Sequence, residues 1–416
     1  MIICGEGIMF LFLLACWKNI QGEIPMEKAK EWNEPLFFHE AAFPYFTLDI
    51  RAGSGHDPIG KEGLAWITAH SLFSDDMRVK IDVGRERVRF QIPLIHGSEE
   101  QVLSKAAQHM TTPMWSGEAV DIAKKQWNKR SIEKQQDPEA FFSPLFLDWL
   151  YEGHPYGHDP MGTYGGHHNI SIFDIYEFYT QYYDRSSIVL SWYGEKEKME
   201  RVEGFFYELE SMPVMLPKYH TPKSIHKHTQ TNIQLFSESS TSSWTAFFGF
   251  AIQEPSLVDR MAMMMMREYL CPESSADFHE SFLLVYDPVL SCSYSTENST
   301  ITQKKLSAWF SLWNSLDNIS MSRISALRLE VVKILREDPS VLHIVDKWFQ
   351  IQTLEEIPSE ELYRAFTKLK NHHPQVAFVF PETASRNLVE EYMDSIVPNV
   401  IGNMDHHTNI FSNKEN

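Results

Sequence analysis

The residues that could do chemistry centre on the stretch GKEGLAWITAHSLF, which begins at Gly60 as the start of a helix and continues as an apolar run. A histidine at position 66 and a glutamate at position 69 would place two imidazoles four residues apart on one helical face. Such a pair can bind zinc, and the carboxylate between them can take a proton from a bound water. The chain has Trp66, Ala69 and His70 instead. One imidazole cannot hold a catalytic zinc ion, so His70 alone predicts a histidine of the core or of an interface.

A second group of imidazoles lies in a loop rich in glycine and proline, between residues 154 and 171. Imidazole and carboxylate are ligands that zinc accepts, so one interpretation is a replacement metal site in this loop. The other, which we favour, is that these are ordinary side chains of turns. The candidate ligands are His154, His158, Asp159, His167 and His168.

Hydrophobic periodicity indicates which elements would position these residues in the first half of the chain. Strands are predicted where apolar and polar residues alternate, helices where apolar residues recur every three to four positions, and breaks at proline. The predicted elements are strands within 36–52, a buried helix over 64–73, a hairpin over 79–95, helices over 99–151 with breaks at Pro113 and Pro138, a loop over 154–171, a helix after the Ser171 cap, a strand over 187–194 and a helix over 195–210.

The second half repeats the first in outline, which predicts an internal duplication of a unit of about 190–200 residues. Residues 212–230 are rich in proline and in basic side chains and predict a linker between the halves. The run MAMMMM, from Met261 to Met266, covers every face of a helix, so we expect most of it to fill the core. The predicted elements are strands over 231–238 and 244–252, a helix over 257–270, strands over 290–297 and 304–314, helices within 322–371 and a strand over 375–382.

Three segments, taken in order, resemble the insulinase/pitrilysin-type zinc metallopeptidases, which include the mitochondrial processing peptidase and the core subunits of the cytochrome bc1 complex. They are AGSGHDPIGKEGLAWITAHSLF (52–73), DPEAFFSPLFLDWLYEGHPYGHDPMGT (137–163) and IFDIYEFYTQYYDRSSIVLSWYGE (172–195). The resemblance implies an α+β fold of two homologous αβ domains, each a mainly antiparallel sheet packed with helices, arranged as a clamshell. The boundaries it implies are 24–215 for the first domain, 216–230 for the linker, 231–404 for the second domain and 405–416 for a flexible tail.

The same resemblance assigns the positions of a metal site. In that family two histidines and a downstream glutamate bind zinc, and the glutamate of H-x-x-E-H activates water. The match places the first ligand at Trp66, the general base at Ala69, the second ligand at His70 and the third, counted back from residues 137–138, at Arg130. A guanidinium repels a dication, and Ala69 cannot accept a proton. The resemblance therefore implies no zinc or other cofactor in this chain, with zinc expected only in a partner chain.

The family's second half often carries an arginine and a tyrosine that bind substrate. The corresponding positions here are Leu284 and Ser291. The sequence therefore leaves the substrate-binding residues unknown, and it weakens a role in positioning substrate for another chain.

The composition is that of a soluble globular protein with a strong acidic excess. The chain has 416 residues, with 56 acidic against 37 basic side chains and a net charge of −19. This balance argues against a nucleic-acid partner, and it would suit basic, extended peptides.

The N-terminal residues 8–17, IMFLFLLACW, form an apolar run shorter than the roughly 20 residues of a membrane span. They predict a signal peptide over residues 1–22 and export to the periplasm or cell envelope of a bacterium. Because LLAC also resembles a lipobox, the alternative is a lipid on Cys16, which would be the sole membrane attachment. Outside this segment only Cys271 and Cys292 remain, so one disulfide at most can form within a mature chain.

These features favour a catalytically inactive member of the peptidase family that pairs with an active, zinc-bearing sister chain to bind and degrade peptides. The alternative partner is a second copy of the same chain. One alternative is a peptide-binding or scaffold subunit with no peptidase partner. Another is an active zinc peptidase with displaced ligands, which the missing base at Ala69 disfavours.

Overall fold

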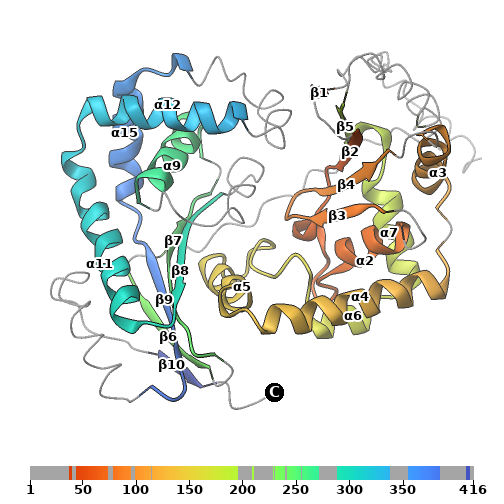
Figure 1. Ribbon diagram of the computed structural model, residues 1–416, viewed down its shortest axis with the longest axis horizontal. Helices are drawn as coiled ribbons and strands as arrows, with labels where there is room; N and C mark the ends of the chain where they lie inside the picture. The colour runs from red at the N-terminus through yellow and green to blue at the C-terminus, as the bar shows by residue number, and fades with distance from the viewer. Residues whose placement is uncertain are drawn as a thin grey trace, which may run out of the picture. The chain divides into compact units, whose positions relative to one another are not determined.

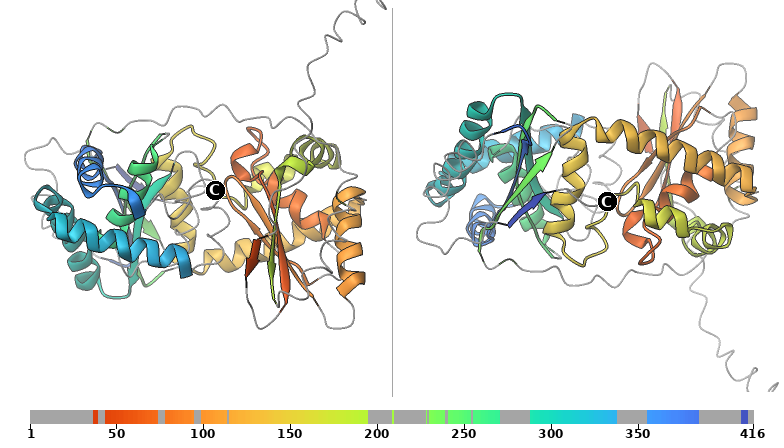
Figure 2. Two further views of the ribbon diagram at one scale, coloured as in Figure 1. Left: turned by 90° about the horizontal axis from the view of Figure 1, so that it is seen from above. Right: turned by 90° about the horizontal axis from the view of Figure 1, so that it is seen from below.

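The computed structural model describes two five-stranded sheets packed with helices (Figures 1 and 2). Among the residues it describes, no helix is long and apolar enough to cross a membrane. The expected signal peptide and most of the expected linker lie outside these residues. The described residues are 37–39, 44–73, 78–94, 99–113, 115–194, 209, 228, 230–238, 241–253, 255–270, 288–337, 355–384 and 409–412.

The first sheet has the strand order β1-β5-β2-β4-β3. Strand β1 runs parallel to β5, and the other neighbours are antiparallel. The central strands β2 and β5 are buried on both faces, and one face of β2 carries the polar residues Thr47 and Asp49. The strands are β1 (Phe37–His39), β2 (Tyr45–Ile50), β3 (Lys80–Val83), β4 (Val88–Pro93) and β5 (Ile188–Tyr193).

The second sheet has the strand order β10-β6-β9-β7-β8. Strands β10, β6 and β9 are mutually parallel neighbours, whereas β7 is antiparallel to both β9 and β8. This sheet is therefore mixed rather than mainly antiparallel. The strands are β6 (Ile233–Glu238), β7 (Trp244–Ala251), β8 (Val289–Thr296), β9 (Gln375–Pro381) and β10 (Asn409–Ser412).

The two sheets share a four-strand core with one topology. In each, the first strand of the half (β1 or β6) lies parallel to its last long strand (β5 or β9), and two antiparallel strands follow in the sheet (β2 and β4, or β7 and β8). A helix follows the second strand in both halves, α2 (Leu64–Leu72) and α9 (Leu257–Leu270). The α+β class and the repeat predicted from the sequence are thus both present in the fold.

Helices cover the sheets on faces set by strand alternation. Along β7, Phe248 and Phe250 face the helices of the second half, whereas Phe247 faces helix α5 from the first half. Phe146 of α5 stacks on Phe247 with ring centroids 5.4 Å apart. The remaining helices are α3 (Glu99–Thr111), α4 (Gly117–Gln135), α5 (Pro138–Leu150), α6 (Tyr164–Asn169), α7 (Ile172–Tyr182), α11 (Ser299–Ser315), α12 (Met321–Glu337) and α15 (Ser359–Lys370).

The structure corrects the prediction of a strand over residues 304–314, because this segment is part of helix α11. Its aromatic residues favoured a strand by propensity. However, Leu306, Trp309, Phe310 and Trp313 recur at the spacing of one helical face and are all buried. Asn298 caps the helix by accepting hydrogen bonds from two backbone N–H groups.

Two other segments differ from expectation. Part of the predicted loop over 154–171 is the short helix α6, which begins after the Thr163 cap. Within the tail expected to be flexible, Asn409–Ser412 form β10, whose backbone pairs with the outer edge of β6. The methionine run agrees with the prediction, since Met261, Met263, Met265 and Met266 are buried in the second core.

Candidate functional site

Helix α2 carries three of the predicted site positions and is buried along its whole length. It begins after Gly63, whose φ of 102° lies in the left-handed region that favours glycine. The buried carboxylate of Asp57 accepts hydrogen bonds from the N–H groups of Gly63 and Ala65, each at 2.7 Å. Burial raises the pKa of Asp57, while a hydrogen bond from His158 and those two backbone donors oppose the rise. The segment before α2 thus fixes where the helix starts, through the hydrogen bonds that Asp57 accepts.

The imidazole of His70 has a hydrogen-bond neighbour on each nitrogen. Its Nδ1 lies 3.0 Å from the carbonyl oxygen of Trp66, which can only accept, so Nδ1 carries the proton. The other nitrogen, Nε2, is then an acceptor, and Nη1 of Arg130 on α4 lies 3.3 Å from it. Burial lowers the pKa of His70 to about 3, and the nearby charge of Arg130 adds to this. The side chain is therefore neutral near pH 7.

The indole of Trp66 fills the space beside this imidazole. It is buried, and its ring stacks on that of His70 with centroids 3.6 Å apart and an interplanar angle of 15°. The guanidinium carbon of Arg130 lies 5.8 Å from the centroid of the Trp66 ring, within the range of a cation–π contact. Arg130 is exposed, so it covers the outer side of the Trp66–His70 pair.

No proton acceptor stands where a general base would be. Ala69 is fully buried and carries only a methyl group. Glu133, the carboxylate nearest to Arg130 in the sequence, is largely exposed and lies 3.8 Å from Nζ of Lys129. The Glu133 carboxylate therefore lies on the outer face of α4, beside Lys129.

The residues of this cluster do not fit a zinc ion. At the positions that the sequence assigned to a metal site and its base stand a tryptophan, a methyl group, a guanidinium and one imidazole, and Arg130 lies at the only free lone pair of that imidazole. Within the described residues, no group of three or more histidine, cysteine, aspartate and glutamate side chains could hold a metal ion.

The structure separates the histidines of the 154–171 segment and gives them local contacts. His154 accepts a hydrogen bond from the N–H of Tyr156 through Nδ1, at 3.2 Å. His158 donates through Nε2 to the carboxylate of Asp57, 3.2 Å away. His168 is exposed on α6. His154 and His158 thus contact neighbouring backbone and the carboxylate of Asp57.

His167 packs beside the cluster on α2. Its Nε2 donates to the carbonyl oxygen of Met161 at 2.6 Å, and its ring stacks on Trp127 with centroids 4.2 Å apart. Burial lowers the pKa of His167 to about 4, with the charge of Lys124 adding to the effect. The imidazole therefore contributes packing as a neutral ring.

Of the two substrate positions implied for the second half, Ser291 lies in β8 and is fully buried, opposite Gly249 of β7. Leu284 lies outside the described residues. Cys292, the next residue in β8, is disulfide-bonded, and Cys271 also lies outside the described residues. A buried Ser291 side chain cannot contact a peptide on the surface.

Sequence reasoning placed Trp66, His70 and Arg130 at one site but missed the contact between Arg130 and His70. It also missed Asp57, which accepts hydrogen bonds from N–H groups six and eight residues further along the chain. This spacing is not that of a usual N-cap, so the sequence pattern did not predict the role.

No protein-family model matches this chain, and no curated protein matches its sequence. Several solved structures match its fold. A protease from Helicobacter pylori is 15% identical with a TM-score of 0.65, over 83% of this chain and 96% of that one. The peptidase M16 inactive domain from Pseudomonas fluorescens is 16% identical with a TM-score of 0.62, over 84% and 96% of the two chains. This chain has the fold of the M16 peptidases.

A third structural neighbour is the first half of the periplasmic protease PqqL from Escherichia coli. It is 11% identical with a TM-score of 0.61, over 89% of this chain and 96% of that one. The M16 fold agrees with the expected peptidase family and with two sheets packed with helices. At such identities the likeness concerns the fold. The chemistry of the α2–α4 cluster has to be argued from its own residues.

Proposed function

We propose that this chain is a catalytically inactive protein with the M16 peptidase fold. It acts as a non-catalytic subunit that pairs with an active, zinc-bearing sister chain for the binding and degradation of peptides. The main observation in support of inactivity is the contact between Arg130 and Nε2 of His70. The lone pair that would bind a metal faces a permanent cation instead.

The surrounding packing supports the same conclusion. The Trp66 ring fills the volume beside His70, and Ala69 offers no base. A zinc ion would need Arg130 to leave, Trp66 to rotate out of a buried position, and two further ligands to be supplied. These three unfavourable changes argue against an active zinc peptidase with displaced ligands.

Export to the periplasm or cell envelope of a bacterium is part of the proposal. The apolar segment at residues 8–17 supports it, and so does the fold shared with a periplasmic protease. The acidic balance of the chain favours peptides with basic side chains.

The second candidate is a peptide-binding or scaffold subunit that has no peptidase partner. The buried position of Ser291 favours it, because the second half then offers no polar group at that place for holding a peptide. The two candidates differ in whether an active sister chain needs this one.

A reconstitution experiment tests the proposal. The full chain is loaded with zinc, passed over a desalting column and assayed for bound metal. Cleavage of a quenched fluorescent peptide library is then measured alone and with a homologous chain from the same genome that carries an intact H-x-x-E-H. We expect no stoichiometric zinc and no cleavage alone, and higher cleavage in the mixture than with the sister chain by itself.

Stoichiometric zinc together with cleavage by this chain alone would overturn the inactive assignment. Unchanged activity in the mixture, with no complex on gel filtration, would instead favour the scaffold candidate.

A further inference from the structure

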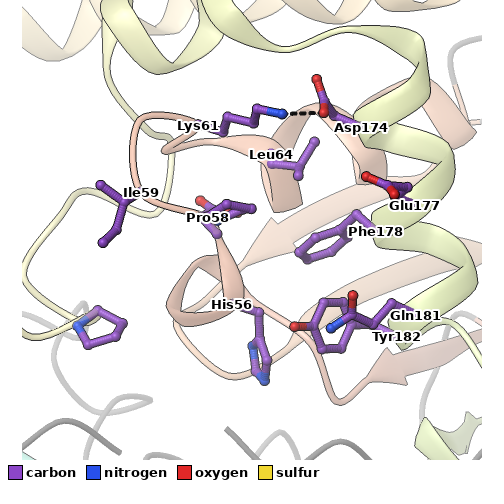
Figure 3. Close-up of a pocket in the computed structure, with 12 residues that line it drawn as sticks. His56, Pro58, Ile59, Lys61, Leu64, Asp174, Glu177, Phe178, Gln181 and Tyr182 are labelled. Carbon is purple, nitrogen blue, oxygen red and sulfur yellow. Dashed lines mark hydrogen bonds and ion pairs between the residues drawn. The ribbon is translucent and has the colours of Figure 1, made fainter. Parts of the chain in front are cut away.

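A pocket of 390 Å³ lies between the loop that precedes α2 and helix α7 (Figure 3). Three parts of the chain line it, namely residues 56–64, Pro155 and residues 174–182. It shares only Leu64 with helix α2, so it is distinct from the cluster around His70.

Helix α7 presents one continuous stripe to this pocket. Its lining residues stand at positions i, i+3, i+4, i+7 and i+8, which lie on one face of a helix. Figure 3 shows these side chains directed from α7 toward the loop opposite. They are Asp174, Glu177, Phe178, Gln181 and Tyr182.

The floor of the pocket is apolar and its rim carries an exposed isoleucine. Leu64 and Phe178 are buried, and Pro58 and Pro155 complete the lining. At the rim, Ile59 is 87% exposed. An exposed apolar side chain beside an apolar pocket favours contact with a partner.

The groups that would bind an anion are already used. Lys61 is paired with Asp174, as Figure 3 shows. The N–H groups at the start of α2 donate to Asp57 instead of to a ligand. A phosphate or carboxylate therefore has no ready donor set here, although it would lie close to a helix N-terminus.

The exposed carboxylate at this pocket is that of Glu177. Asp57 and Asp174 also line it, but Asp57 is buried and accepts hydrogen bonds from the start of α2, and Asp174 is paired with Lys61. Glu177 lies one turn along α7 from the Lys61–Asp174 pair. Its charge favours a cation, and the net charge of −19 acts in the same direction.

We propose that this pocket is the docking site for a basic side chain of a protein partner, an arginine or lysine flanked by apolar residues. The aliphatic stem of that side chain lies over Phe178, its charged head reaches Glu177, and a flanking apolar residue contacts Ile59. The pocket and the α2–α4 cluster can be altered separately, so this docking does not depend on the proposed inactivity.

Binding of short capped peptides to the full chain tests the proposal. The probes are N-acetyl-Leu-Arg-Leu amide and its counterparts with glutamine or glutamate in the middle, followed by NMR or calorimetric titration. We expect the arginine peptide to bind most tightly. Glu177→Gln should weaken it about three- to fivefold, the effect of an ion pair at a partly exposed site.

Two further variants make the outcome specific. Glu118→Gln removes an exposed acidic residue in the first turn of α4 and should leave the affinity unchanged. Ile59→Ser should weaken all three peptides, because it removes an apolar contact they share. Equal affinity for the three peptides, no effect of Glu177→Gln, or no saturable binding would overturn the proposal. Circular dichroism of each variant confirms that the fold is intact.

Discussion

Nη1 of Arg130 lies 3.3 Å from Nε2 of His70, so a guanidinium on α4 covers the one imidazole of α2. The imidazole gains a donor for its lone pair, and the arginine gains the face of Trp66. A hydrogen bond and a cation–π contact thus link the two helices.

Arg130→Ala should lower the free energy of unfolding by about 1–2 kcal/mol, because it leaves a buried acceptor without its donor. It should also raise the pKa of His70, since the charge of Arg130 helps to lower it. Urea unfolding measures the first effect and NMR titration of the imidazole measures the second. Lys129→Ala, one position away and largely exposed, is the matched control and should change neither.

The combined change Trp66→His, Ala69→Glu and Arg130→Glu should create a site that binds one zinc ion per chain. It restores two imidazoles, a base and a carboxylate on the same two helices, and it removes the repelling guanidinium. Metal analysis after desalting gives the stoichiometry. The double variant that keeps Arg130 should bind no zinc, and equal zinc binding by both would contradict the role given to this residue.

Gly63→Ala should destabilise the chain far more than Gly60→Ala. Both glycines have positive φ, 102° and 80°, so each substitution costs about 1–2 kcal/mol of backbone energy. A Cβ at Gly63 would also lie 2.4 Å from Nε2 of His167, whereas one at Gly60 meets nothing within 4 Å. The difference between the melting temperatures of the two variants measures the cost of the clash at Gly63. Similar melting temperatures would contradict a clash with His167.

The sequence predicted the local elements well where one period dominated. Helix α2 was predicted from its apolar run. Counting back from residues 137–138 placed Arg130 at the same site, and in the structure Arg130 contacts His70. Helix α11 was wrongly predicted as a strand because Trp309, Phe310 and Trp313 have high strand propensity, although their spacing is that of one helical face.

Other features could not have been predicted, because they depend on residues far apart in the chain. The pocket exists because Lys61 pairs with Asp174, 113 positions away, which holds the loop before α2 against α7. The helix after Ser171 was predicted from the sequence, but nothing in the sequence indicated which residues it would face. The packing of α5 on the second sheet likewise joins helices and strands that no local pattern connects.

Phe146→Ala should destabilise the chain by about 3–5 kcal/mol, the usual cost of removing a large buried aromatic side chain. Phe146 is buried in α5 and stacks on Phe247 of β7, so its loss opens a cavity between the helix and the second sheet. Denaturant unfolding measures the change. The adjacent Leu145 is 42% exposed, and Leu145→Ala should cost well under half as much. Equal losses would show that α5 does not use this face for packing.

The stability of the chain should fall as the pH drops from about 6.5 toward 4, owing to His70 and His167. An unfolded histidine titrates near pH 6.5. In the folded chain the pKa of His70 is lowered to about 3 and that of His167 to about 4. Between these values the unfolded state binds more protons, so folding loses up to about 1.4 kcal/mol per pH unit for each histidine. Above pH 7 both are neutral in either state, and their contribution to the slope vanishes.

Unfolding free energies measured across this range, with His167→Gln compared with the parent chain, test the assignment. The variant should have a shallower slope below pH 6.5, because one of the two buried imidazoles no longer has to be protonated on unfolding. His168→Gln is the matched control, since His168 is exposed on the same helix and should leave the slope unchanged. Equal slopes for all three chains would mean that buried imidazoles do not set the acid sensitivity of this fold.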